Sequence, residues 1–167
     1  MTLPNKTART HTTISMQSST QHKKHIADNR KARFNYFIED EYEAGIVLKG
    51  TEVKSMRNGK VNIKDAYAKI QNDEVFLYQM HIGVYAFAYY ENHDPLRVRK
   101  LLLHKREIEK LYSKVNEKGL SLIPLQVYFV NGKVKVKIAL AKGKHLYDKR
   151  ETIKKRDDQR DFDRSQR

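Results

Sequence analysis

The clearest alternation of apolar and polar residues lies near the C-terminal end of the chain, between Lys133 and Leu140. Successive side chains of an extended strand point to opposite faces, so the pattern places aliphatic residues on one face and lysines on the other. We predict a strand with one face in a core and the other facing a polyanion or water. Gly143 ends the pattern, and a charged segment follows. The alternating residues are Val134, Val136, Ile138 and Leu140 against Lys133, Lys135 and Lys137.

Other apolar segments predict short strands joined by tight turns. A first strand is predicted over residues 29–38, and a second follows the acidic cluster at residues 39–43. Two further strands flank a turn at residues 71–74. Asn131-Gly132 is the strongest hairpin signal in the chain. It joins the strand that ends at Val130 to the strand described first.

Two helices are predicted, over residues 50–58 and 104–118. The first has a helix start at Gly50 and Thr51, and its acid Glu52 suits the positive end of the helix dipole. The second shows apolar residues at helical spacing and ends at a glycine. The inward residues are Val53 and Met56 in the first helix, and Ile108, Leu111 and Val115 in the second.

These elements predict a mainly β fold with two or three peripheral helices. About six short antiparallel strands favour a closed barrel of the oligonucleotide-binding (OB) type over a sandwich. We place this domain at residues 28–142 and expect a disordered basic arm at residues 1–27. The C-terminal tail, residues 143–167, has too few apolar residues to fold alone, so we expect it to be disordered when free and ordered when bound.

Charge identifies the kind of partner. The chain of 167 residues has 34 Lys and Arg against 20 Asp and Glu, a formal net charge of +14. Such an excess favours a polyanion, and we expect RNA or DNA. The chain has no cysteine and no apolar window of about 20 residues, the length of a membrane span. We therefore expect a cytoplasmic protein with no membrane partner.

The sequence contains no recognisable catalytic motif. Phosphate-binding loops, dinucleotide-binding turns, zinc-protease helices and nucleophile elbows are all missing. The histidines at positions 81, 93 and 104 lack zinc-ligand spacing, so we expect no metal and no cofactor. The acidic cluster at residues 39–43 leaves a metal-dependent nuclease open, although we expect these acids to orient nearby Arg or Lys.

Basic side chains stand beside aromatic ones at several places. Arg33 precedes Phe34, and Tyr147 precedes Lys149 and Arg150. Such pairs bind unpaired RNA, because rings stack on bases while cations neutralise phosphates. We expect Arg33 and Phe34 to contact RNA, and Tyr147 to do the same from the tail, where no core is available to it.

Five segments resemble the small protein B family of tmRNA-binding proteins, and they occur in the same order over about residues 28–156. They read N-R-K-A-R from Asn29, Y-E-A-G-I-V-L-K-G-T-E-V-K-S-M-R from Tyr42, D-P-L-R-V-R-K-L-L-L-H-K-R-E-I from Asp94, K-V-K-I-A-L-A-K-G-K from Lys135, and Y-D-K-R-E from Tyr147. Many family members have His where this chain has Phe34, and some have Asn in place of His104 and His in place of Tyr147.

The resemblance implies a barrel of the OB type without catalytic activity. It also implies binding to the tRNA-like domain of tmRNA and its delivery, with elongation factor Tu, to stalled ribosomes for trans-translation. In the family, the tail lies in the vacant mRNA channel at the decoding centre and forms a helix there. We expect this chain to act as a monomer.

The resemblance also assigns residues to these roles. RNA binding would involve Glu43, Leu102 and His104, with Lys54 and Arg57 as phosphate contacts. The tail residues that would engage the ribosome are Gly143, Lys144, Tyr147, Asp148, Lys149, Arg150, Lys154, Lys155, Arg156 and Arg160. The alternative is a general rRNA-binding or ribosomal protein on the same barrel, whose tail merely binds rRNA.

Overall fold

The computed structural model describes residues 23–88 and 91–165, which form a mainly β structure with four helices. Residues 1–22, predicted to form most of a disordered arm, lie outside the described residues. The strands are β1 (Lys23–Asp28), β2 (Tyr36–Ile46), β3 (Val61–Asn62), β4 (Tyr67–Gln71), β5 (Glu74–Tyr78), β6 (His81–Ile82), β7 (Arg99–Leu102), β8 (Ser121–Val130) and β9 (Lys133–Gly143). The helices are α1 (Arg30–Asn35), α2 (Gly50–Arg57), α3 (Lys105–Lys118) and α4 (Leu146–Ser165).

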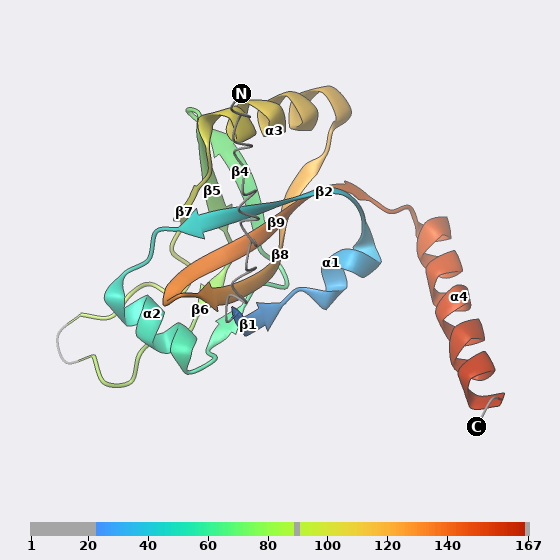
Figure 1. Cartoon of the computed structure of the whole chain (residues 1–167), viewed down its shortest axis with the longest axis horizontal. Coiled ribbons are helices and arrows are strands. Elements are labelled where there is room, and N and C mark those ends of the chain that lie inside the picture. Colours follow the sequence, from blue (N-terminus) through green and yellow to red (C-terminus); the bar gives the residue numbers. More distant parts are fainter. Residues whose placement is uncertain (1–22, 89–90, 166–167) are drawn as a thin grey trace, which may run out of the picture.

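The main sheet is antiparallel and closes on itself. Its strand order is β1-β8-β4-β5-β7-β2-β9, and β8 also pairs with β9. This extra pairing joins β8, β4, β5, β7, β2 and β9 into a ring, while β1 pairs with β8 alone. The two short strands β3 and β6 form a separate sheet. In Figure 1, β9 lies near the middle of the fold, flanked by β2 and β8.

The alternation in β9 positions the core as the sequence predicts. Val136, Ile138 and Leu140 are fully buried. The lysines between them lie on the outer face, where they are exposed or half-buried. Since β9 pairs with β2 over nine registered positions and with β8 over nine more, it is the strand that holds the ring together.

Helices α2 and α3 confirm the two helices predicted from the sequence. Ile108 and Leu111 of α3 and Met56 of α2 are buried in the main core cluster. Gly119 ends α3 in the left-handed conformation with φ of 59°, which a glycine adopts without steric cost. Figure 1 shows α3 across one end of the ring and α2 near the other.

Both predicted hairpin turns are confirmed by their backbone angles. Asn72 and Asp73 have φ of 50° and 56° between β4 and β5. Asn131 and Gly132 have φ of 48° and 77° between β8 and β9. Two successive residues with positive φ match the right-handed twist of the paired strands.

The start of the ordered chain differs from the prediction. Residues 23–27, assigned to the arm, form most of β1, and residues 30–35, assigned to a first strand, form α1. Buried Asn29 explains the helix, because its side chain accepts a hydrogen bond from Ala32 N at 3.0 Å. Its Nδ2 also donates to the carbonyl oxygens of Ile63 and Pro124, so this corner is fixed to the sheet.

The acidic cluster at residues 39–43 does not interrupt the sheet. Strand β2 continues through it for 11 residues, from Tyr36 to Ile46, and pairs with β9 along most of its length. Its acids alternate with residues that pack inward, such as Tyr42 and Ala44, so the strand keeps one apolar face despite its charge.

The described residues contain four helices, whereas the sequence predicts two or three. The additional ones are α1 and α4. Helix α4 covers most of the C-terminal tail and extends away from the ring (Figure 1). Its residues are exposed or half-buried, because the segment has no apolar face to bury. The disorder of the tail in the free protein stays a prediction.

Candidate nucleic-acid interface

Three residues that the sequence assigns to RNA binding lie around one hollow on the surface. Glu43 comes from β2, Leu102 from β7, and His104 from the residue before α3. The hollow has a volume of about 730 Å³, and its floor includes Val53 of α2 and Val134 of β9. Glu43 and His104, which are 61 positions apart in sequence, therefore share one site.

Glu43 is held on the outer face of the ring by a phenol and an ammonium group. Tyr128 donates a hydrogen bond from its hydroxyl to Glu43 Oε2, and Lys135 Nζ lies 3.7 Å from Oε1. The hydrogen bond from Tyr128, with the nearby charges of Lys135 and Lys23, lowers the pKa of Glu43 below its usual value. Glu43 is thus an ionised, oriented hydrogen-bond acceptor at the edge of the hollow.

Tyr128 was not predicted as a functional residue. It is buried, and Lys23 Nζ of β1 lies 5.3 Å from its ring centre. Burial, together with the carboxylate of Glu43, raises the pKa of Tyr128, so the hydroxyl remains a donor. The sequence gives no signal for this contact, because it joins β2 to β8 across the intervening strand β9.

Leu102 is exposed because a glycine faces it. The β2–β7 register places Gly45 opposite Leu102, and 52% of the leucine remains accessible to solvent. A Cβ on Gly45 would lie 3.2 Å from Leu102 Cβ, a tight contact that would require Leu102 to shift by a few tenths of an ångström. The absence of a side chain at Gly45 thus leaves room for Leu102.

His104 is the residue that caps α3 at its N-terminus. Its backbone N donates to Glu107 Oε2 at 2.9 Å, a contact that fixes the start of the helix. The imidazole is exposed and borders the hollow. The ring therefore lies where a nucleic acid that fills the hollow can reach it.

Lys54 and Arg57 project from α2 beside the hollow. They are three residues apart on the helix, so they share one face, and both are exposed. Val53, the residue before Lys54, lines the hollow itself. The two predicted phosphate contacts do not line the hollow themselves, but they lie on the helix that contributes Val53 to it.

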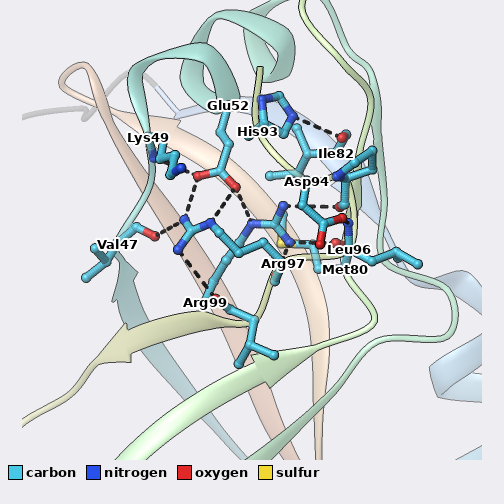
Figure 2. Close-up of polar contacts among 12 residues, drawn as sticks. Val47, Lys49, Glu52, Met80, Ile82, His93, Asp94, Leu96, Arg97 and Arg99 are labelled. Atoms are coloured by element: carbon cyan, nitrogen blue, oxygen red, sulfur yellow. Dashed lines mark hydrogen bonds and ion pairs between the residues drawn. The ribbon is translucent and has the colours of Figure 1, made fainter. Parts of the chain in front are cut away.

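A buried ion cluster fixes α2 in this place (Figure 2). Glu52 points from the first turn of α2 between the guanidinium groups of Arg97 and Arg99. Arg97 Nη2 lies 2.7 Å from Glu52 Oε2, and Arg99 Nε lies 2.8 Å from Oε1. The side chains of Glu52 and Arg99 are fully buried, so this contact attaches α2 to β7.

The electrostatics of the cluster follow from burial and pairing. Burial alone would raise the pKa of Glu52, but hydrogen bonds from Arg97, the backbone N of Lys49 and Arg99 outweigh it and lower the pKa. Arg99 also donates to the carbonyl oxygens of Met80 and Pro95, at 2.6 and 3.2 Å. The sequence predicts Glu52 as a dipole partner for α2, but it does not show that Arg99 is buried.

The acidic cluster of β2 contacts cations of the protein itself. Asp40 forms an ion pair with Lys114, and Glu41 Oε2 lies 2.9 Å from Lys137 Nζ. The described residues hold no group of three or more His, Cys, Asp or Glu that could bind a metal ion. The basic face of β9 is therefore partly neutralised by β2, whereas the sequence predicts that it faces a polyanion or water.

Arg33 and Phe34 lie apart from the hollow, on α1. Arg33 Nη2 is 3.4 Å from Glu41 Oε1, and Phe34 is half-buried. The neighbouring contacts belong to the start of the tail, because Lys144 N donates to Asn35 O at 2.8 Å. The structure thus groups Arg33 and Phe34 with the tail and not with Glu43.

A cation–aromatic pair beside α1 was not predicted. Lys144 Nζ lies 4.8 Å from the ring centre of Phe37, and the Phe37 side chain is exposed. The sequence separates the two residues by 107 positions, so only the pairing of β2 with β9 brings them together.

The remaining tail residues lie on α4 or just before it. Asp148 Oδ2 accepts from His145 N at 3.0 Å and caps the helix, so Asp148 has a local structural role. Tyr147 is exposed, and a hydrogen bond with Glu151 raises its pKa. Lys149 is half-buried near the start of α4. The exposed basic residues are Arg150, Lys154, Lys155, Arg156 and Arg160.

Among the described residues, no helix is long and apolar enough to cross a membrane. The antiparallel ring, the cationic helix α2 and the hollow beside it define a class of small basic β proteins suited to a folded polyanion. The chain belongs to the SmpB protein family, whose model matches residues 26–167.

Two SsrA-binding proteins are similar to this chain over most of its length. It is 58% identical over 137 residues to the SsrA-binding protein of Geobacter sulfurreducens, covering 82% of this chain and 90% of that protein. It is 59% identical over 144 residues to the SsrA-binding protein of Acetivibrio thermocellus, covering 86% and 94%. A chain of the solved structure "tmRNA-SmpB: a journey to the center of the bacterial ribosome" is 49% identical, with a TM-score of 0.61 and coverage of 72% and 85%.

Proposed function

We propose that this chain binds the tRNA-like domain of tmRNA and delivers it to stalled ribosomes for trans-translation. The observation that carries this function is the meeting of Glu43, Leu102 and His104 at one hollow, in a chain of the SmpB family. The relatives are SsrA-binding proteins, and the similar solved structure contains tmRNA with SmpB. The excess of positive charge suits an RNA partner.

The ring of six strands acts, in this proposal, as a closed barrel of the OB type that presents the hollow. Leu102 supplies an apolar contact for a base or ribose, and Glu43 accepts hydrogen bonds from base edges. Lys54 and Arg57 neutralise neighbouring phosphates. Each of these roles is one of binding, so the chain acts without catalysis.

In this proposal, the C-terminal tail binds the ribosome. Its basic residues enter the vacant mRNA channel near the decoding centre, while the ring holds the tRNA-like domain. The supporting observation is that α4 extends away from the ring (Figure 1) and buries no large apolar side chain. Arg33, Phe34 and Lys144, which lie where the tail begins, belong with this contact. The protein acts as a monomer in the cytoplasm, in a complex with elongation factor Tu.

A gel-shift competition at fixed salt tests the function. A labelled tRNA-like domain of tmRNA is bound to the full chain and then challenged with unlabelled tRNA-like domain, rRNA fragments or other structured RNA of equal length. We expect only the tRNA-like domain to compete at low concentration, because specific contacts add to the shared phosphate term. Equal competition by all of these RNAs would instead indicate a general RNA-binding protein.

A pair of leucine variants places the site. Leu102→Ala should weaken binding to the tRNA-like domain by about fivefold, as the loss of one apolar contact implies. Leu146→Ala is the matched control, because Leu146 is also exposed but lies at the start of α4, away from the hollow. Equal affinity of the two variants would show that the hollow is not the RNA site.

A further inference from the structure

An aromatic pair lies beside α2, outside the set of residues that line the hollow. Phe87 is 71% exposed, and Tyr85 packs against it edge to face, with ring centres 5.7 Å apart and planes at 64°. We call these two side chains the aromatic platform. A large ring this exposed is costly in water unless it has a partner. Nothing in the functions described above uses it.

The chain on either side of the platform is fixed to α2. Gly83 N donates to Lys60 O at 2.9 Å, and Ser55 Oγ donates to Gly83 O. Beyond the platform, the ring nitrogens of buried His93 lie 3.0 Å from Thr51 Oγ1 and 3.1 Å from Ile82 O. A carbonyl oxygen only accepts, so His93 Nε2 donates to it.

Tyr85 itself is clamped from two sides. Asn92 Nδ2 donates to Tyr85 O at 2.8 Å, and Tyr85 N donates to Asn92 Oδ1 at 3.2 Å. Lys54 Nζ lies 5.5 Å from the centre of the Tyr85 ring. Tyr85 is therefore held in place before any ligand arrives, and Phe87 packs against this fixed ring.

The cations around the platform have no acidic partners among the described residues. Lys54, Arg57 and Lys60 are exposed, and none of them forms an ion pair there. The lysines of β9 differ, because Lys135 and Lys137 are paired with glutamates of β2. Unpaired cations next to an exposed ring attract an anion that also has a flat apolar face, which is the chemistry of a nucleotide.

We propose that Phe87, supported by Tyr85, stacks on one unpaired base of the bound RNA, while Lys54, Arg57 and Lys60 neutralise the phosphates that flank this base. The inference rests on the proposed function, since it adds a contact to the same RNA. Lys54 links the platform to the hollow, because the preceding residue, Val53, lines the hollow.

Fluorescence of a modified base tests the stacking directly. The probe is a single-stranded RNA of about eight nucleotides that carries one 2-aminopurine, a base whose emission falls when it stacks. The full chain should quench this emission and should bind the oligonucleotide about tenfold more tightly than an abasic oligonucleotide of equal length. Phe87→Ala should abolish both the quenching and the preference, and Phe87→Tyr should restore them.

Two further variants separate stacking from charge. Tyr112→Ala is the matched control, because Tyr112 is also exposed but lies on α3, and this variant should behave as the unmodified chain does. Lys54→Met should weaken both oligonucleotides equally and should reduce the salt dependence, as expected for a phosphate contact. Quenching that survives in Phe87→Ala would overturn the inference and leave Phe87 as a site for a protein partner.

The same variants distinguish this inference from the proposed function. Suppose that Phe87→Ala quenches the emission as the unmodified chain does, while the tRNA-like domain still competes selectively. The inference that Phe87 stacks on a base is then wrong, and the proposed function stands. Suppose instead that the unmodified chain shows no preference for the tRNA-like domain but quenches 2-aminopurine through Phe87. The proposed function is then wrong, and the inference that Phe87 stacks on a base stands.

Discussion

Tyr128 donates its hydroxyl hydrogen bond to Glu43, from β8 to β2 across the intervening strand β9. The contact connects a buried ring to an exposed carboxylate at the edge of the hollow. It holds the carboxylate ionised and fixes its direction. Glu43 is therefore positioned for recognition before RNA binds.

Tyr128→Phe should raise the pKa of Glu43 towards its ordinary value, because the hydrogen bond from Tyr128 is the largest cause that lowers it. A carboxyl titration by NMR measures this change directly. We also expect binding to the tRNA-like domain to weaken by about two- to tenfold, the usual effect of one hydrogen bond. An unchanged pKa in the variant would show that the nearby lysines alone keep Glu43 ionised.

The same pair gives a pH dependence of stability. A lowered carboxyl pKa stabilises the folded state above the pKa of the unfolded chain, and this contribution disappears as the pH falls through the folded pKa. The stability difference between the unmodified chain and Tyr128→Phe should therefore be largest at neutral pH and should shrink in acid. Urea unfolding at several pH values measures it, and a difference that grows in acid would contradict the assignment.

Arg99→Met should destabilise the fold by about 3–5 kcal/mol, because Glu52 would keep a buried charge with only part of its compensation. The double variant Glu52→Gln with Arg99→Met should recover part of this loss. Arg106→Met is the control, because Arg106 is exposed on α3 and its loss should cost less than about 0.5 kcal/mol. Urea unfolding compares the three variants, and equal stability of Arg99→Met and Arg106→Met would refute the role of the cluster.

Gly45→Ala should weaken RNA binding by about threefold, since the new Cβ would lie 3.2 Å from Leu102 Cβ and would shift this side chain at the edge of the hollow. Gly50→Ala is the matched control, because nothing lies within 4 Å of the Cβ it would add. A gel shift with the tRNA-like domain compares the two variants. If both bind equally well, the exposed position of Leu102 has no part in recognition.

Lys149→Ala with Arg150→Ala should leave binding to the tRNA-like domain unchanged but should abolish peptide tagging on stalled ribosomes. The two residues lie on α4, away from the hollow, so only the ribosome contact should be lost. Lys110→Ala with Lys118→Ala removes the same charge from α3 and should tag normally. Normal tagging by the tail variant would show that these charges do not act on the ribosome.

Hydrogen exchange tests the predicted disorder of the tail. Amides of residues 150–165 should exchange rapidly in the free protein, because an isolated charged helix of this length is marginal in water. Amides in β9, which are bonded on both sides, serve as the internal reference and should exchange slowly. Binding to ribosomes should slow exchange in the tail, and slow exchange without ribosomes would contradict the prediction.

Local patterns in the sequence identified most of the fold. The alternation in β9, the Asn131-Gly132 turn and the glycine stop of α3 each depend on neighbouring residues alone, and each is confirmed. Helix α1 was missed, because the apolar residues that follow it resemble the start of a strand. Its cap, Asn29, is a common N-cap residue, but the bonds that bury it join Ile63 and Pro124, which are distant in sequence.

The candidate site was likewise predicted only in part. The motif residues Glu43, Leu102 and His104 were predicted from the sequence, and the structure brings them together. The contacts of Tyr128 and Arg99 were not predicted, because each depends on burial beside a single acid that is distant in sequence. Local sequence does not determine such pairs, because they form only when the ring closes.

Strand β9 leads directly into the tail, and it is hydrogen-bonded to β2 on one side and to β8 on the other. A force that pulls on α4 along the strand would act in shear on both rows of hydrogen bonds at once, so they would have to break together. The tail is thus anchored to a strand that is paired along both of its edges. If the ring and the tail bind different partners, as proposed, this double row of hydrogen bonds opposes unravelling of the chain from its C-terminal end.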